Sequence, residues 1–309
     1  MAYCVEKLYW TRFSCLSEPE AHERPKTRSH VHMNLIKLQP KYVPNIFRVH
    51  LVASTIIFTF VLVLTALAQE YLPGIEWKEP EHVTPGRTNQ DPPSDAVILF
   101  NGVDTTGWNN AETWKVIDGF LIVGKGMIST KESFGDCQLH VEWSSPLPAE
   151  GTGQGRGNSG VFFGPYEIQV LDSFENSTYF DGQAAAIYKQ TPPLVNVMRK
   201  PGEWNSYDII WNTPRFDSAG KLTEPATVTV LHNGVLVQNN FELLGDTPYN
   251  RPPRYNPHPP ELPIRLQDHR NPVRFRNIWV RKISPIQGTR GQPPAIRKGK
   301  TTTLLPKTG

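Results

Sequence analysis

The chain has 309 residues, enough for one large domain or two small ones. Its 32 basic and 29 acidic residues give a formal net charge of +3, and so small an excess does not indicate a nucleic-acid-binding protein. Only three cysteines are present, which excludes a fold held together by several disulfides.

The N-terminal region has the pattern of a targeting segment. Residues 33–68 begin with scattered basic residues and continue in an uncharged run, residues 51–68, that ends in Ala66-Leu67-Ala68. Small residues in this spacing are typical of a signal-peptide cleavage site, so we expect an exported, periplasmic or extracellular protein cleaved after Ala68. The alternative is a membrane anchor through residues 51–68, because that run is nearly long enough to span a bilayer.

Residues 1–32 form an unusually long leader ahead of this segment, and translation from Met33 would explain it. Cleavage after Ala68 would remove Cys4 and Cys15, leaving Cys137 as a single thiol. Because Cys137 lies in the strand-like segment DCQLHVEW, we expect it to be buried and inert.

Composition divides the rest of the chain into three parts. Residues 69–94 are rich in proline and predict an extended lead-in, and residues 95–283 contain the folded domain. Residues 284–309 carry five basic residues and no acidic ones, with scattered proline and glycine and no apolar periodicity. This composition predicts a basic, disordered tail.

Short apolar segments predict β-strands throughout residues 95–283. They are rich in β-branched and aromatic residues, as in AVILF, CQLHVEWSS, YEIQVLD and VRFRNIWVRKI, and turn-forming residues separate them. Asn233-Gly234 in LHNGVLV predicts a type I′ hairpin turn. Since no segment has a sustained helical period, we predict an all-β single domain, a two-sheet antiparallel β-sandwich of the jelly-roll kind.

The glycine pattern Gly155-x-Gly157-x-x-Gly160 has the spacing of a dinucleotide-binding turn. That turn requires a strand before it and a helix after it, whereas here a turn-rich segment precedes the glycines and a strand-like segment follows them. We therefore expect these glycines to build a loop.

The segment YEIQVLD contains polar residues where a buried strand would have apolar ones. Alternation places Glu167, Gln169 and Leu171 on one face of the strand, and Tyr166, Ile168 and Val170 on the other. For an isolated Glu-x-Gln pair the ordinary interpretation is a solvated strand face, with Asp172 as a turn residue. The alternative is the floor of a binding site.

A second polar concentration lies near the end of the domain, in RLQDHRNPVRFRNIWV. We interpret this segment as a strand, a turn and a second strand, with more polar residues than an edge hairpin needs. The polar residues are Gln267, Asp268, His269, Arg274, Arg276 and Asn277.

The order of several motifs resembles the 3-keto-disaccharide hydrolase family. AVILFNGVDTTGW, GNSGVFFG, YEIQVLD, AAIYKQTPP, KPGEWNSYDI, HNG and IRLQDH…VRFRNIWVRKI occur in that order within residues 95–283. The resemblance implies a concanavalin-like β-sandwich of a type found mostly in exported bacterial proteins. It also implies cleavage of glycosides whose sugar carries a ketone at carbon 3.

Such a ketone acidifies the hydrogen on carbon 2. A base can then remove that hydrogen, and the enolate expels the substituent on carbon 1, after which water adds or the unsaturated sugar leaves. The route needs a general base, an acid for the departing oxygen and a positive group near the enolate oxygen. No credible nicotinamide or flavin site is present, so we expect a separate sugar 3-dehydrogenase to supply the keto substrate.

Within this resemblance, Glu167, Asp172 and His269 are the candidate acid and base residues, and a divalent cation bound by the same three is an open alternative. Polar contacts with the sugar are expected from Asn158, Gln169 and Gln267. Tyr188 and Trp204 are candidates for stacking on a sugar ring or for packing. Arg276 either contacts substrate or, with Asn277, supports the sheet.

Two other functional classes stay open at this stage. A noncatalytic carbohydrate-binding module would use the same sandwich and aromatic residues, and a cell-surface interaction protein is compatible with the basic tail. Activity on 3-keto substrates would distinguish an enzyme from both. The sequence leaves the oligomeric state open.

Overall fold

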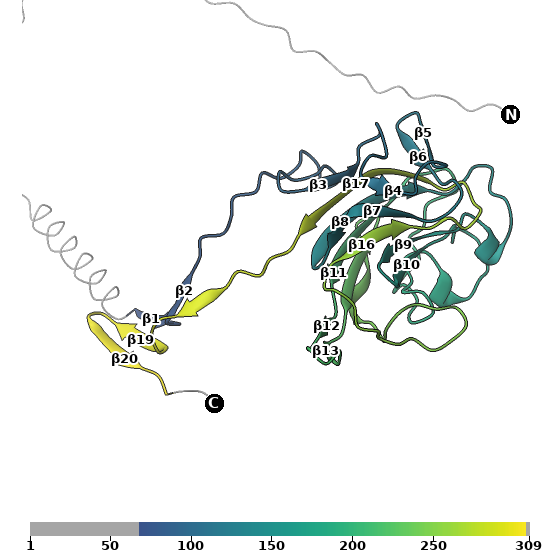
Figure 1. Cartoon of the computed structure of the whole chain (residues 1–309). Helices are drawn as coiled ribbons and strands as arrows, with labels where there is room; N and C mark the ends of the chain where they lie inside the picture. The colour runs from purple at the N-terminus through teal and green to yellow at the C-terminus, as the bar shows by residue number, and fades with distance from the viewer. Residues whose placement is uncertain (1–67, 307–309) are drawn as a thin grey trace, which may run out of the picture. The chain divides into compact units, whose positions relative to one another are not determined.

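The computed structural model describes residues 68–306, and two large antiparallel sheets form the larger of its two compact units (Figure 1). One sheet has eight strands in the order β15-β14-β11-β8-β17-β6-β5, with β3 also paired to β17. These strands are β3 (Val97–Phe100), β5 (Lys115–Ile117), β6 (Phe120–Ile122), β8 (Cys137–Ser144), β11 (Asn205–Asn212), β14 (Thr227–His232), β15 (Val235–Glu242) and β17 (Arg274–Lys282).

The second sheet has five strands in the order β10-β9-β16-β7-β4. Its strands are β4 (Trp108–Asn109), β7 (Ile128–Phe134), β9 (Ser159–Phe163), β10 (Tyr166–Val170) and β16 (Leu262–Leu266). A small ribbon pairs β12 (Arg215–Phe216) with β13 (Leu222–Glu224). The helical elements of the described residues are two single 3-10 turns, η1 (Gly153–Gly155) and η2 (Phe180–Gly182). The predicted all-β antiparallel sandwich is confirmed.

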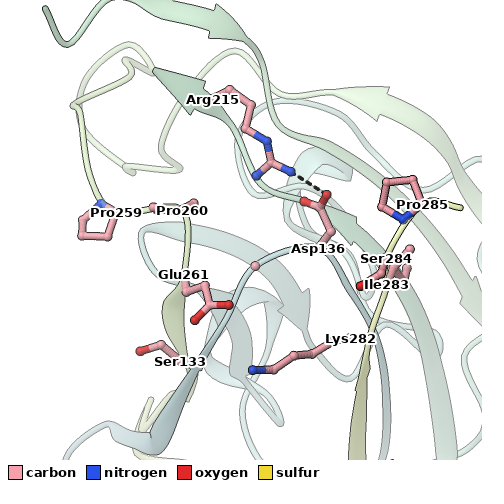
Figure 2. A pocket seen from close by; sticks show the side chains of 11 residues that line it. Ser133, Asp136, Arg215, Pro259, Pro260, Glu261, Lys282, Ile283, Ser284 and Pro285 are labelled. Carbon is pink, nitrogen blue, oxygen red and sulfur yellow. Dashed lines mark hydrogen bonds and ion pairs between the residues drawn. The ribbon is translucent and has the colours of Figure 1, made fainter. Parts of the chain in front are cut away.

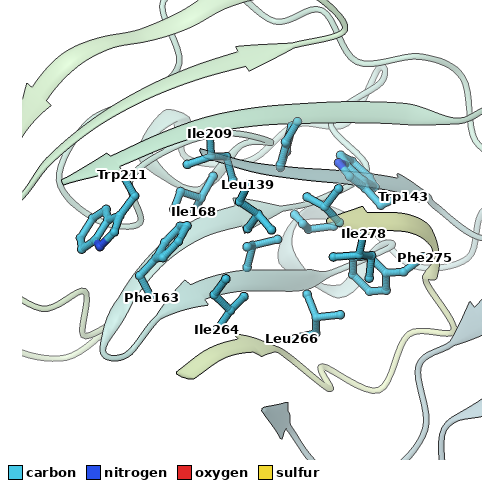
Figure 3. Packing of buried hydrophobic residues seen from close by; sticks show 14 of the residues in the cluster. Leu139, Trp143, Phe163, Ile168, Ile209, Trp211, Ile264, Leu266, Phe275 and Ile278 are labelled. Carbon is cyan, nitrogen blue, oxygen red and sulfur yellow. The ribbon is translucent and has the colours of Figure 1, made fainter. Parts of the chain in front are cut away.

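The hydrophobic core lies between the two sheets, where alternate residues of each strand meet (Figure 3). In β8, Leu139, Val141 and Trp143 are fully buried in this layer. From the opposing sheet, Phe163 stacks on Trp211 of β11 with ring centroids 4.8 Å apart. Cys137 is also buried here, and burial raises the pKa of its thiol to about 12, so the thiol stays protonated at neutral pH.

The predicted hairpin turn at Asn233-Gly234 joins β14 to β15. Asn233 has φ of 52° and Gly234 has φ of 77°. Two consecutive positive φ angles are what a type I′ turn requires, and asparagine and glycine tolerate them best.

The segment RLQDHRNPVRFRNIWV forms a strand, a connection and a second strand, as expected, but the two strands do not pair with each other. The first strand, β16, belongs to the five-stranded sheet, and the second, β17, belongs to the eight-stranded sheet. Both strands bury apolar residues in the core, Ile264 and Leu266 from one and Phe275 from the other, so they face each other across the sandwich. Local alternation cannot distinguish this crossing loop from a hairpin, because both have a polar turn between alternating strands.

The structure forms short strands both in the lead-in, where extended chain was expected, and in the tail, where disorder was expected. β1 (Gln69–Leu72), β19 (Ala295–Lys298) and β20 (Thr301–Leu304) make a three-stranded sheet in the order β1-β19-β20, and β2 (Ile75–Trp77) pairs with β18 (Gly288–Arg290). An ion pair joins Glu70 to Arg297. Pairing between segments so distant in the sequence supplies backbone hydrogen bonds that local composition does not reveal.

Residues 68–306 include no helix with the length and apolar character needed to span a bilayer. The expected leader at 1–32, the signal peptide at 33–68 and the alternative anchor at 51–68 lie outside the described residues, apart from Ala68.

Candidate active site

The outer face of the five-stranded sheet carries two rows of side chains across β16, β9 and β10. The first row consists of Arg265, Phe162 and Glu167, which are direct cross-strand partners. In the second row, Gly160 is the partner of Gln169, and the carbonyl oxygen of Gly160 accepts a hydrogen bond of 3.1 Å from the amide of Gln267. Because the intervening residues of each strand point into the core, both rows face away from it.

A cavity of about 560 Å³ lies over this face. Six residues proposed from the sequence line it, and so do Gln154, Phe162, Thr247 and Tyr249, which the sequence analysis did not single out. The six are Asn158, Glu167, Gln169, Tyr188, Gln267 and His269.

Glu167 is the carboxylate that lines this cavity. The ordinary interpretation of its strand predicts a solvated side chain, but the side chain is buried. The residue is 5% exposed, and its backbone amide donates to Thr247 Oγ1 at 3.0 Å. Burial raises the pKa of its carboxyl to about 8, and the nearby Arg265 guanidinium partly opposes that rise. In the described part of the chain, no other carboxylate lines the cavity.

Gly160 makes room for the Glu167 carboxylate. A Cβ atom at position 160 would lie 2.5 Å from Glu167 Oε1 and 2.6 Å from Phe162 Cε2. Gly160 does not have a positive φ, so the space above it, rather than backbone conformation, requires glycine.

Gly160→Ala is therefore expected to displace Glu167 and lower kcat, by roughly a hundredfold if the shift approaches about 1 Å. Gly155→Ala is the matched control, because a Cβ atom at that position would meet nothing within 4 Å. Steady-state rates and thermal unfolding of both variants test this. Full activity of folded Gly160→Ala would show that the position of Glu167 does not matter.

Three amide side chains beside Glu167 have oxygen atoms without hydrogen-bond partners. These are Oδ1 of Asn158, Oε1 of Gln169 and Oε1 of Gln267, all of them buried. Buried acceptors are nearly always paired in native proteins, so three in one cavity indicate a site for a ligand that carries donors. Sugar hydroxyl groups meet that requirement.

The loop after η2 forms one wall of the cavity. The amide of Ala185 donates to the carbonyl oxygen of Gln169 at 2.9 Å, and the amide of Gln169 donates to that of Ala186 at 3.0 Å, so the loop is fixed along β10. Tyr188 of this loop shares a hydrogen bond of 2.7 Å with Tyr179. Burial raises the pKa of the Tyr188 hydroxyl, which therefore stays protonated.

His269 is an exposed residue that lines the cavity, and it follows Gln267 of the second row by two positions. Its neighbour Asp268 holds the loop in place by accepting hydrogen bonds from the amides of Gly126 at 2.9 Å and Arg270 at 2.7 Å. His269 is exposed to solvent and lines the same cavity as Glu167, which suits a group that exchanges protons.

Asp172 does not join the cavity. Its carboxylate is 2.8 Å from Arg156 Nε and accepts a hydrogen bond of 3.2 Å from the amide of Phe174. The predicted metal-binding set of Glu167, Asp172 and His269 is not assembled, and residues 68–306 hold no group of three such ligands. The loop before β9 places Arg156 beside the end of β10, where it pairs with Asp172, and strand alternation does not reveal this pairing.

Trp204 and Arg276 also lie outside the cavity, beside the eight-stranded sheet. Arg276 Nε is 2.6 Å from Glu142 Oε2, and Asn277 Nδ2 donates to Glu142 Oε1 at 2.8 Å. The Arg276 guanidinium lies 4.1 Å from the centre of the Trp204 ring. This arrangement favours the alternative in which Arg276 and Asn277 support the sheet and Trp204 packs.

A hollow of about 620 Å³ at the other end of the sandwich is slightly larger (Figure 2). Three of its charged residues form ion pairs: Arg215 is 2.6 Å from Asp136, and Lys282 is 3.2 Å from Glu132. This hollow offers no cluster of unpaired buried polar atoms, so the cavity beside Glu167 is the candidate active site.

Arg265 is the main residue of the site region that sequence reasoning missed. It lies in the strand LPIRL, two residues before Gln267, so strand alternation applied to this segment would have placed both on one face. Gln154 and Thr247 come from loops, whose position no local pattern predicts.

A family model for the 3-keto-alpha-glucoside-1,2-lyase-like domain matches residues 95–281. A "putative glycosyl hydrolase" of known structure from Parabacteroides distasonis ATCC 8503 is 46% identical, with a TM-score of 0.65 over 67% of this chain and 94% of that chain. Another of the same description from that organism is 25% identical, with a TM-score of 0.46 over 61% of this chain and 99% of that one. None of the curated proteins matches. The family match confirms the resemblance seen in the sequence: the chain belongs to the 3-keto-alpha-glucoside-1,2-lyase-like domain family, and its function is carbohydrate-active.

Proposed function

We propose that the protein is an enzyme that cleaves glycosides bearing a ketone at carbon 3, and that Glu167 removes the hydrogen at carbon 2. The observation that carries this proposal is the single carboxylate among the residues lining the cavity. Ordinary glycosidases place two carboxyl groups about 5 to 10 Å apart on either side of the bond. Elimination beside a ketone needs only one base, so it fits a site with one carboxylate.

The proposed reaction proceeds in balanced steps. The Glu167 carboxylate takes the proton from carbon 2, the electron pair of that C–H bond forms the enolate, and the enolate then breaks the bond from carbon 1 to the leaving oxygen. His269 supplies the proton that this oxygen needs. Addition of water across the new double bond gives the free keto sugar. A base with a pKa of about 8 is stronger than an ordinary carboxylate, which suits removal of a weakly acidic C–H proton.

Arg265 tunes this base through its charge. Because the guanidinium lowers the pKa of Glu167, replacing it by a neutral side chain raises that pKa further. In Arg265→Met the rising limb of kcat/KM against pH is expected to move to higher pH, whereas Arg265→Lys, which keeps the charge, moves it less. If the rising limb of kcat/KM against pH stays at the same pH in folded Arg265→Met, Arg265 does not lower the pKa of Glu167.

The substrate requirement is tested by incubating the protein with one disaccharide in its 3-keto and unoxidised forms, followed by mass spectrometry. We expect cleavage of the keto form alone. Comparable cleavage of both forms would contradict the elimination route, and binding of sugar without cleavage of either would favour the noncatalytic module. The proposal also requires a partner enzyme that oxidises carbon 3, since the reaction consumes a ketone and produces none.

Export remains part of the proposal. Secreted protein is expected to begin at Gln69, the first residue of β1. N-terminal sequencing of material from the culture medium or periplasm tests this, and protein retained in the membrane with residues 51–68 intact would support the anchor instead.

A further inference from the structure

The orientation of one amide side chain, that of Gln154, is determined by its surroundings. Gln154 lies in η1, within the glycine-rich loop. Its Nε2 donates to the carbonyl oxygen of Gly182 and to Thr178 Oγ1, both at 2.9 Å. A backbone carbonyl can only accept, so Nε2 must face Gly182, and Oε1 must face the opposite way.

Gln154 in turn fixes the two amides next to it. Gln169 Nε2 donates to Gln154 Oε1 at 2.9 Å and, over a longer 3.4 Å, to the carbonyl oxygen of Gly182. Asn158 Nδ2 donates to the backbone oxygen of Gln154 at 2.7 Å and to Gln154 Oε1 at 3.4 Å. The donor groups of both amides are thereby used inside the protein. Their oxygens, Gln169 Oε1 and Asn158 Oδ1, are left buried and unpaired in residues that line the cavity.

We propose that Gln154 is a positioning residue. It holds the side-chain amides of Gln169 and Asn158 so that only their oxygen atoms are left for a ligand, and the site therefore selects a neutral sugar ring whose free hydroxyl groups donate to these oxygens. The proposal rests on the carbohydrate function proposed above. Gln154 acts on Gln169 through its side chain and on Asn158 through its backbone.

The amide oxygens of Gln169 and Asn158 also determine how a 3-keto sugar is oriented. A ketone oxygen has no proton to donate, so it cannot pair with either amide oxygen, and the ring binds with carbon 3 turned away from Gln169 and Asn158. A methyl ether, a carboxylate or a sulfate has no donor at neutral pH either. Sugars that carry these groups in place of the recognised hydroxyls leave a buried acceptor unpaired and are rejected.

The test uses a 3-keto glycoside and its derivatives, each with one hydroxyl replaced by hydrogen or a methyl ether. For the wild type we expect kcat/KM to fall roughly tenfold to a hundredfold at three positions, the cost of one unpaired buried acceptor at each: Gln169 Oε1, Asn158 Oδ1 and Gln267 Oε1. Gln154→Met removes the 2.9 Å bond and leaves only the 3.4 Å contact with the Gly182 carbonyl to hold Gln169 Nε2, so this amide can turn its donor to the substrate. It is expected to lose discrimination at the position that pairs with Gln169 and to keep it at the positions that pair with Asn158 and Gln267.

Thr178→Val is the matched control. It removes one hydrogen bond from Gln154 but leaves the Gly182 carbonyl, which alone fixes the amide, so the wild-type pattern is expected to persist. Thermal unfolding of each variant accounts for any general loss of stability, which would not change the ratio between substrates.

Wild-type enzyme that discriminates at no position, or folded Gln154→Met with the full wild-type pattern, would overturn the inference. Failure of the proposed function is a separate result. It would be seen as cleavage of the unoxidised form of the sugar. The ratio of kcat/KM between each hydroxyl derivative and the unmodified sugar can then be measured with whichever form, 3-keto or unoxidised, is cleaved.

Discussion

Glu167→Gln is expected to lower kcat at least a hundredfold while leaving the fold intact. The substitution keeps the shape of the side chain and removes its ability to take a proton, and general acid or base groups contribute about that factor or more. In the wild type, kcat/KM is expected to rise with pH until the carboxyl, with its pKa of about 8, is ionised. Steady-state rates across pH measure both effects, and a fully active, folded variant would return Glu167 to a structural role.

The same variant is expected to change how stability depends on pH. The folded-state pKa of about 8 lies above the ordinary value of 4.5, so between these values the folded protein binds more protons than the unfolded chain. The contribution of Glu167 to the free energy of unfolding is therefore fully present below pH 4.5 and is lost as the pH rises through 8. At about 1.4 kcal/mol per pKa unit, the loss is on the order of a few kcal/mol. Urea unfolding at several pH values should show this fall in the wild type and its absence in Glu167→Gln.

Asp172→Asn is expected to destabilise the protein by about 3 kcal/mol, because removing one partner of a buried ion pair leaves the other charge unpaired. Asp172 is 1% exposed, and the side chain of its partner Arg156 is only 16% exposed. Well below the unfolding temperature, the variant should keep most of its activity, because Asp172 does not line the cavity.

Glu132→Gln is the control for this effect. It breaks a pair with Lys282 in which both side chains are about half exposed, so it should cost less than about 1 kcal/mol. Denaturant unfolding and activity assays measure both variants. An inactive Asp172→Asn variant with unchanged stability would restore the catalytic role expected from the sequence.

The alternation of single strands predicted much of the site. It placed Glu167 and Gln169 together on one face of β10. Gln267, directly after β16, was instead proposed from the polar density of its segment and from the family resemblance. Alternation does not specify which strands become neighbours. It therefore gave no reason to exclude Arg276, whose strand lies in the opposite sheet, or to include Gln154, which reaches Gln169 from a loop.

Burial was the other property that the sequence could not supply. An isolated Glu-x-Gln pair is usually solvated, and only the covering loop at Ala184–Tyr188 and the side chain of Thr247 show that Glu167 is enclosed. The terminal strands were missed for a related reason: β1 and β19 are stabilised by pairing with each other rather than by their own composition.

The most direct test of the account follows a deuterium label at carbon 2 of a 3-keto disaccharide, in ordinary water, with an enzyme-free control for spontaneous exchange. If Glu167 removes this hydrogen before the glycosidic bond breaks, the released keto sugar has lost the label, and cleavage is slower than for the unlabelled substrate where this step limits the rate. Mass spectrometry at early times measures the label. Release of keto sugar that retains its deuterium, at the rate of the unlabelled substrate, would show that water attacks carbon 1 directly and would contradict the proposed elimination.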